Sequence, residues 1–103
     1  MEISQADFAR ARQAGDPVID VRTNAEYASG HVPGALSIPL DDLTARLAEV
    51  PAGRVQVICA SGNRSKIAVS LLRRAGRDAW SVTGGTAAWA GAGNRVTLGA
   101  TPA

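Results

Sequence analysis

The only cysteine of the chain, Cys59, lies between a predicted strand and a predicted tight loop, a position that suits a nucleophile. It follows the apolar run 55–58, whose β-branched residues and short length predict a buried strand. It precedes the segment 60–65, Ala-Ser-Gly-Asn-Arg-Ser, whose residues tolerate tight backbone turns. Beyond this segment, apolar residues recur at helical spacing until Gly76. The predicted order is strand, cysteine, tight loop, helix.

This order predicts an activated thiolate beside an anion cradle. The N–H groups of a loop that enters a helix converge on one point, and the helix dipole adds partial positive charge there. A cysteine at the rim of such a loop ionises below the pKa of roughly 8.5 that a free thiol has. Arg64 and Lys66 favour the same ionisation. The alternative is an inert, buried cysteine, but the loop composition and the two cations favour the reactive thiolate.

Several other elements must position this loop. Strands are expected at 18–21, 36–38, 55–58 and 79–82. Helices are expected from Ser4 to about Ala14, from Thr23 to Gly30, from Asp41 to before Pro51, from Ser65 to Gly76 and from Gly85 through Trp89. Thr23 and Glu26 have the spacing of a capping box.

The alternation of short strands and helices predicts an α/β fold with three layers. In such a fold a central, mainly parallel sheet of about five short strands has helices on both faces. Ligands bind beyond the carboxyl ends of the strands. Cys59 follows one such end, and Asp20 with Arg22 marks another.

Length and charge narrow the class of protein. A chain of 103 residues forms one domain, and a single cysteine allows no internal disulfide. Residues 1–49 hold four Lys or Arg against eight Asp or Glu, a balance of −4. Residues 50–103 hold seven against one, a balance of +6. This positive field around the loop attracts small anions, although Arg73, Arg74 and Arg77 fit a solvated helix face.

Other partners and locations are not expected. Trp80 and Trp89 fit core positions, so we expect no nucleic-acid partner. No apolar stretch approaches the ~20 residues that span a bilayer, and the first residues lack the apolar segment of a signal peptide. We expect a cytoplasmic monomer, unless the chain is part of a longer protein. Residues 98–103 are expected to form a short flexible tail after a domain at 1–97.

Beyond the loop, motifs along the chain resemble the rhodanese domain, a sulfurtransferase module. The matching motifs are Cys59-Ala-Ser-Gly-Asn-Arg-Ser65, Asp20-Val-Arg22, Glu26-Tyr27, Gly30-His-Val-Pro-Gly-Ala35, Pro39 and Thr83-Gly-Gly85 with Trp89. Together they cover about Ile3 to Val96. Rhodanese domains have an α/β fold, so the resemblance agrees with the predicted elements.

The resemblance implies a transfer of sulfane sulfur through a persulfide on Cys59. The donor would be an anion such as thiosulfate, and the acceptor a thiol or cyanide. We expect the substrate to be bound by Arg22 and by the loop residues Ala60, Ser61, Gly62, Asn63, Arg64 and Ser65. Asp20 and Lys66 are expected to support the site, with no cofactor. One histidine and one cysteine do not make a usual zinc site, so no metal is expected.

Some roles stay open at the level of sequence. Arg64 suits the oxyanion end of a donor, but a salt bridge that only shapes the loop is the alternative. Arg22 fits substrate contact and structural pairing equally well. Asp20 is expected to accept backbone or arginine hydrogen bonds, and His31 lies in a turn that suggests a structural role.

Two other functions compete with a free-standing sulfurtransferase. Cysteine-dependent phosphatases have the pattern Cys, five residues, Arg, whereas four residues separate Cys59 from Arg64. This shorter loop makes a smaller cradle, which suits one sulfur atom better than a phosphate. The other candidate is a relay or binding module that passes sulfur to a partner protein, and the sequence does not separate it from the free enzyme.

Overall fold

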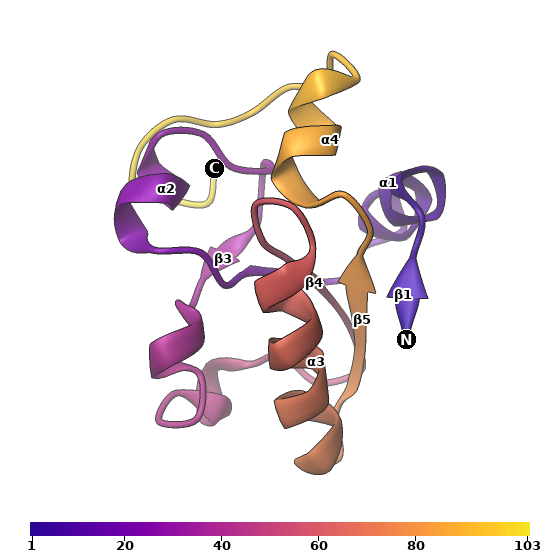
Figure 1. The fold of residues 1–103 in the computed structure, drawn as a ribbon, viewed down its shortest axis with the longest axis vertical. Coiled ribbons are helices and arrows are strands. Elements are labelled where there is room, and N and C mark those ends of the chain that lie inside the picture. Colours follow the sequence, from indigo (N-terminus) through magenta and orange to yellow (C-terminus); the bar gives the residue numbers. More distant parts are fainter.

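A five-stranded parallel sheet forms the centre of the computed structural model, which describes all residues from 1 to 103 (Figure 1). Its strands are β1 (Glu2–Ile3), β2 (Val18–Asp20), β3 (Leu36–Ser37), β4 (Arg54–Ile58) and β5 (Asp78–Val82). The strand order is β1-β5-β4-β2-β3, and every neighbouring pair is parallel. The helices are α1 (Gln5–Gln13), α2 (Asn24–Ala28), α3 (Asn63–Arg74) and α4 (Gly85–Gly91).

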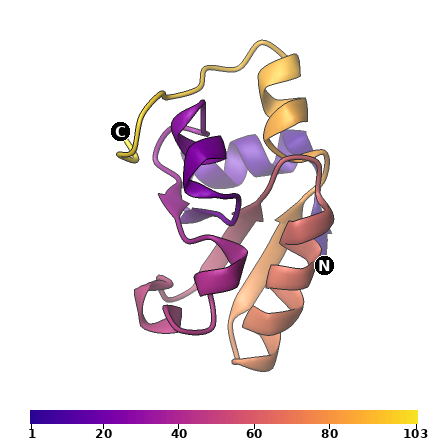
Figure 2. The same cartoon turned by 60° about the vertical axis from the view of Figure 1, so that its left-hand side comes forward.

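Two hydrophobic clusters show that both faces of the sheet are covered. Alternate residues of β4 point to opposite faces, so Val55 and Val57 join one cluster and Ile58 joins the other. The first cluster packs under α3, which contributes Ala68, Val69 and Leu72. The second contains Phe8 of α1, Tyr27 of α2 and Trp89 of α4. Figure 2 shows this arrangement, with α3 apart from the other three helices. The expected three-layer α/β fold is confirmed.

Two details differ from the sequence-based expectation. The helix expected after Asp41 is wrong: this segment forms two 3-10 turns, η1 (Leu40–Asp42) and η2 (Leu47–Glu49). The N–H of Leu40 donates to the carbonyl of Val21 at one end of the segment. At the other end, Arg77 donates to the carbonyls of Leu47 and Val50. Contacts with other elements therefore hold both ends in tight turns. The fifth strand is β1, which is too short to leave a pattern in the sequence.

The residues after α4 run back across the molecule toward α2 (Figure 2). Thr97 pairs with His31 in an isolated antiparallel bridge. Farther along, the N–H of Gly99 donates to the carbonyl of Ala28 at 2.8 Å. The flexibility of 98–103 stays a prediction. None of the helices has the length and apolar character needed to cross a membrane.

Candidate functional site

Cys59 lies directly after β4, at the carboxyl edge of the sheet, where the loop turns into α3. The residue is 1% exposed. The N–H of Gly62 donates to its Sγ at 3.1 Å, and Sγ donates to the hydroxyl of Ser65 at 3.4 Å. Gly62 has a φ of 111°, a backbone conformation that favours glycine, and it is the N-cap of α3. The loop therefore folds back over the sulfur.

These contacts lower the pKa of the Cys59 thiol below its ordinary value. Burial is the largest single influence and opposes ionisation. Hydrogen bonds from the Ser65 side chain and from the N–H groups of Ser65, Gly62 and Ser61 favour the thiolate and together outweigh burial. The start of α3 adds the positive end of a helix dipole. The loop therefore stabilises the thiolate, which is the nucleophilic form of a cysteine side chain.

The first turn of α4 holds the backbone of Cys59 and Ala60. The N–H of Thr86 donates to the carbonyl of Cys59 at 2.8 Å, and the N–H of Ala87 donates to that of Ala60 at 3.0 Å. Gly85 lies so close that an added Cβ would stand 2.5 Å from the Cys59 carbonyl oxygen. Gly85, the first residue of α4, thus lets this helix approach the nucleophile loop, residues 59–65.

Arg64 forms a bidentate ion pair with Glu26, with N–O distances of 2.7 and 2.9 Å. The hydrogen bonds to Arg64 hold the pKa of the Glu26 carboxyl at about 2, although burial, the next largest influence, opposes this shift. Glu26 also accepts hydrogen bonds from Thr23, so the expected capping box is present. The structure therefore contains the salt bridge that was the alternative role of Arg64. Contact of Arg64 with a donor stays a prediction.

Asp20, the last residue of β2, and Arg22, two residues later, form a buried pair. The Asp20 carboxylate accepts hydrogen bonds from Nε and Nη2 of Arg22, the latter at 2.7 Å. Nη2 also donates to the carbonyl of Gly30 at 2.8 Å. Asp20 is 0% exposed and Arg22 is 6% exposed. Of the two roles open to Arg22, structural pairing is the one seen here; substrate contact stays a prediction.

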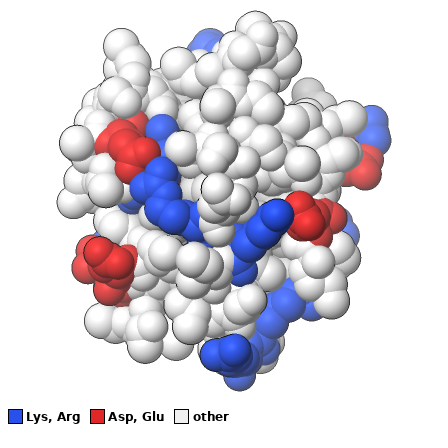
Figure 3. Space-filling view, viewed as in Figure 1, with Lys and Arg blue, Asp and Glu red and all other residues white.

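The other cations near α3 are less concentrated at the loop than the sequence suggested. Lys66 lies 3.8 Å from Glu2, and its side chain is 57% exposed. Arg73 and Arg77 were expected on a solvated helix face, but their side chains also donate hydrogen bonds to backbone carbonyls. Figure 3 shows Lys and Arg side chains spread over this face, with acidic groups beside some of them. Several of these cations are therefore engaged in contacts away from the Cys59 sulfur.

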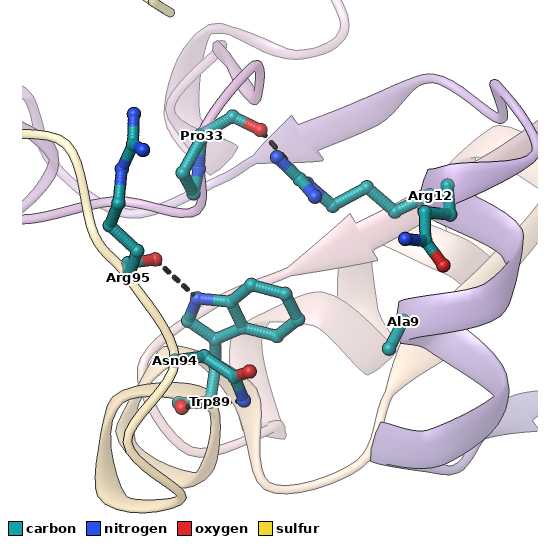
Figure 4. A pocket seen from close by; sticks show the side chains of 7 residues that line it. Ala9, Arg12, Pro33, Trp89, Asn94 and Arg95 are labelled. Atoms are coloured by element: carbon teal, nitrogen blue, oxygen red, sulfur yellow. Dashed lines mark hydrogen bonds between the residues drawn. The ribbon is translucent and has the colours of Figure 1, made fainter.

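His31 and Trp89 are part of the packing. His31 is 0% exposed, its Nδ1 bonds the carbonyl of Tyr27 at 2.9 Å, and its ring stacks on that of Tyr27. Trp89 packs against Phe8 and donates its indole N–H to the carbonyl of Arg95 (Figure 4). The hollow beside it, about 410 Å³, is lined by no residue of the nucleophile loop. The core position expected for Trp80 is only partly met, because it is half-buried under Arg73.

Three contributors to the site were not predicted from the sequence. Glu26 and Gly85 belonged to motifs of the resemblance, but the sequence assigned neither of them a contact with the cysteine loop. Ser81 of β5, whose hydroxyl lies 2.7 Å from that of Ser65, belonged to no motif. Its position in a strand that neighbours β4 is what brings it to the loop. No group of three or more His, Cys, Asp or Glu side chains is placed to hold a metal ion.

Two other proteins are similar in sequence to this chain. The chain is 38% identical over 102 residues to the HTH-type transcriptional regulator Rv0324 of Mycobacterium tuberculosis, covering 95% of this chain and 45% of the regulator. It is 39% identical over 75 residues to a sulfurtransferase of Allochromatium vinosum, covering 71% of this chain and 70% of that protein. The chain therefore spans less than half of the length of the regulator.

A solved structure has a fold similar to that of this chain. The crystal structure of a rhodanese-related protein from Thermoplasma volcanium superposes with a TM-score of 0.88, at 33% identity, over 94% of this chain and 97% of that one. The model of the Rhodanese-like domain family matches residues 4–92, which include the whole nucleophile loop, Gly84 and Gly85 at the start of α4, and the Asp20–Arg22 pair. By sequence and by fold, the chain belongs to the rhodanese-like domain family.

Proposed function

We propose that this domain is a sulfurtransferase that carries sulfane sulfur as a persulfide on Cys59. The observation that carries the proposal is the buried thiol with a lowered pKa, bound by the N–H of Gly62 at 3.1 Å at the start of α3. The similarity to the Allochromatium vinosum sulfurtransferase supports the same reaction class. We propose thiosulfate as a donor and a thiol or cyanide as an acceptor.

The reaction has two displacement steps at sulfur. The Cys59 thiolate attacks the outer sulfur of thiosulfate, a new S–S bond forms, and the bond to the sulfonate sulfur breaks as sulfite leaves with the electron pair. The persulfide keeps one negative charge on its terminal sulfur. Cyanide or an acceptor thiolate then attacks this sulfur and restores the Cys59 thiolate. Attack by the thiolate needs no general base, and the hydrogen bonds of the loop favour that ionised form.

The loop is suited to the persulfide. The N–H groups of Ser61, Gly62 and Ser65 already stabilise negative charge on the Cys59 sulfur. The terminal persulfide sulfur is itself an anion, which such groups also stabilise. The four-residue gap between Cys59 and Arg64 favours this small ligand over a tetrahedral phosphate. Family membership favours sulfur transfer over the phosphatase alternative as well.

A relay module is the second candidate, and one observation favours it. The relative in Mycobacterium tuberculosis is a transcriptional regulator more than twice as long as the matched region. A rhodanese-like domain in such a protein would pass sulfur to a partner or to another domain. Turnover with thiosulfate and cyanide alone supports the free enzyme, whereas turnover that appears only with an added partner protein supports the relay.

Intact mass after incubation with thiosulfate tests the proposal. We expect the protein to gain one sulfur atom, which cyanide or a thiol removes. Because Cys59 is the only cysteine, the variant Cys59→Ser is the matched control and gains nothing. If neither thiosulfate nor polysulfide leaves a sulfur adduct on the wild-type protein, the sulfurtransferase function is wrong.

A further inference from the structure

Behind the thiol lies a chain of two buried hydroxyl groups. Ser65 Oγ lies 3.4 Å from Cys59 Sγ, and Ser81 Oγ lies 2.7 Å from Ser65 Oγ. Ser65 is 0% exposed and Ser81 is 1% exposed, so water does not compete for these contacts. Ser65 belongs to the first turn of α3, whereas Ser81 is supplied by β5. The chain thus links the thiol to a different element of the sheet.

Ser65 has fewer hydrogen-bond donors than it has neighbours that could accept a hydrogen bond. A serine hydroxyl has one proton to donate and two lone pairs to accept. Ser65 Oγ lies within hydrogen-bond distance of three groups: the sulfur, the Ser81 hydroxyl and, at 3.1 Å, the carbonyl of Gly62. While Cys59 is a thiol, its S–H donates to Ser65, and Ser65 can donate to the Gly62 carbonyl. Once Cys59 is a thiolate, it only accepts, and the proton of Ser65 has to turn toward it.

We propose that Ser81 is a positioning residue that favours the Cys59 thiolate by donating a hydrogen bond from its hydroxyl to Ser65 Oγ. Ser65 Oγ is the only hydrogen-bond partner of the Ser81 hydroxyl. When Ser81 donates this hydrogen bond, Ser65 Oγ accepts it through a lone pair. The O–H of Ser65 then remains free to donate to the sulfur. Hydrogen bonds in such a row polarise one another, so the donor to the sulfur becomes stronger. Ser81 itself does not touch the reacting sulfur.

Charged groups around the thiol provide the rest of its electrostatic environment. Those at this edge of the sheet are Arg64 with Glu26, the Asp20–Arg22 pair and the exposed Lys66. The end of β5 at Ser81 and the whole of α4 carry no charged side chain. Substitution of Ser81 therefore removes a hydroxyl group without changing any charge near the thiol.

The test is the pH dependence of thiolate formation, read from the rate of alkylation of Cys59 by iodoacetamide and from thiolate absorbance. The inference deepens the proposed function, because it concerns the same thiol, but neither readout requires sulfur transfer. A failure of sulfur transfer therefore leaves this test intact. In Ser81→Ala we expect the titration midpoint to rise by roughly half a pH unit to one pH unit, which corresponds to the loss of one hydrogen bond.

A matched pair of variants separates the hydroxyl from packing. Ser81→Thr keeps the hydroxyl and should restore the wild-type midpoint, whereas Ser81→Val has the same shape without it and should titrate like Ser81→Ala. In the background Ser65→Ala, the added change Ser81→Ala should shift nothing more, because Ser81 acts through Ser65. Equal midpoints in wild type and Ser81→Ala overturn the inference. So does an equal shift in Ser81→Thr and Ser81→Ala, or an undiminished shift in the Ser65→Ala background.

Discussion

Both carboxylate oxygens of Glu26 accept hydrogen bonds from the guanidinium of Arg64, at 2.7 and 2.9 Å. The same carboxylate caps α2 through Thr23, so the ion pair ties the start of α2 to the first turn of α3. Arginine has five N–H groups, and those that Glu26 does not use stay available to an anion. Arg64 is thus held in place beside the loop and retains donors for an incoming substrate.

Replacement of Arg64 by alanine should reduce turnover of thiosulfate more than turnover of a neutral sulfane donor, such as an organic trisulfide. A charge-assisted hydrogen bond to the sulfonate oxygens would be lost only with the anionic donor, which corresponds to a fall of about tenfold or more in kcat/KM. The measurement is kcat/KM for each donor with cyanide or a common thiol as acceptor.

The variant Arg74→Ala is the matched control, because Arg74 is exposed at the far end of α3 and forms no salt bridge. It should leave both donors nearly unaffected. Equal losses with the two donors in Arg64→Ala would instead assign Arg64 to the shape of the loop, through its contact with Glu26.

Replacement of Glu26 by glutamine should remove an acid-dependent part of stability. The pKa of Glu26 in the folded protein is about 2, below its ordinary value of 4.5, and the first cause is Arg64. The ionised carboxylate therefore stabilises the fold above pH 4.5, and this contribution is lost as the pH falls toward 2. At pH 7 we expect the variant to be less stable by about 1 kcal/mol, because a partly exposed ion pair is screened by solvent.

Urea unfolding of both proteins at pH 7 and near pH 3 measures this effect. The difference in the free energy of unfolding between wild type and Glu26→Gln should shrink at the lower pH. A difference that stays constant with pH would mean that capping of α2, rather than the charge of Glu26, carries the stabilisation.

Replacement of Gly85 by alanine should disrupt the nucleophile loop. The new Cβ would meet the carbonyl oxygen of Cys59 at 2.5 Å, and the φ of 59° disfavours any side chain. We expect a loss of more than about 2 kcal/mol in the free energy of unfolding, or a displaced loop with a higher thiol pKa. Gly91→Ala is the matched control, because nothing lies within 4 Å of its added Cβ. If Gly85→Ala folds and reacts like wild type, α4 does not hold the loop.

Much of the site was predictable because the chemistry is local in the sequence. The strand, Cys59, the tight loop and α3 are consecutive, so a short range of residues determines the geometry of the nucleophile. The capping box of Thr23 and Glu26 was also predictable, since its partners lie three residues apart. Positions that depend on local backbone preferences are those that the sequence predicts well.

Contacts between distant elements were not predictable from one sequence. Arg64 and Glu26 are 38 residues apart, and their pairing depends on how α2 packs beside the loop. Ser81 has no distinctive neighbours in the sequence and reaches Ser65 only because β5 adjoins β4. The segment after Asp41 was assigned as a helix from its pattern. Its ends are held by hydrogen bonds from Leu40 to the carbonyl of Val21 and from Arg77 to the carbonyl of Val50, which periodicity does not reveal.

The length of the loop can be tested by one inserted glycine. Gly62 has a positive φ and nothing closer than 3.6 Å to an added Cβ, so an insertion after it disturbs the surroundings least. Cys59 would keep its place after β4, and Arg64 its partner Glu26. The N–H groups would no longer converge on a single sulfur, so we expect thiosulfate turnover to fall by at least about tenfold. Reaction of Cys59 with iodoacetamide near neutral pH should largely survive.

A glycine inserted after Gly76 is the control for this insertion, because that residue also has a positive φ and has open space around it. It should leave turnover close to wild type, since the turn after α3 lies at the opposite end of the helix from Cys59. Unchanged thiosulfate turnover after the insertion at Gly62 would mean that loop length does not set the chemistry. Loss of alkylation with retained folding would mean that the inserted residue displaces the donors that stabilise the thiolate, and not only those that hold the outer sulfur.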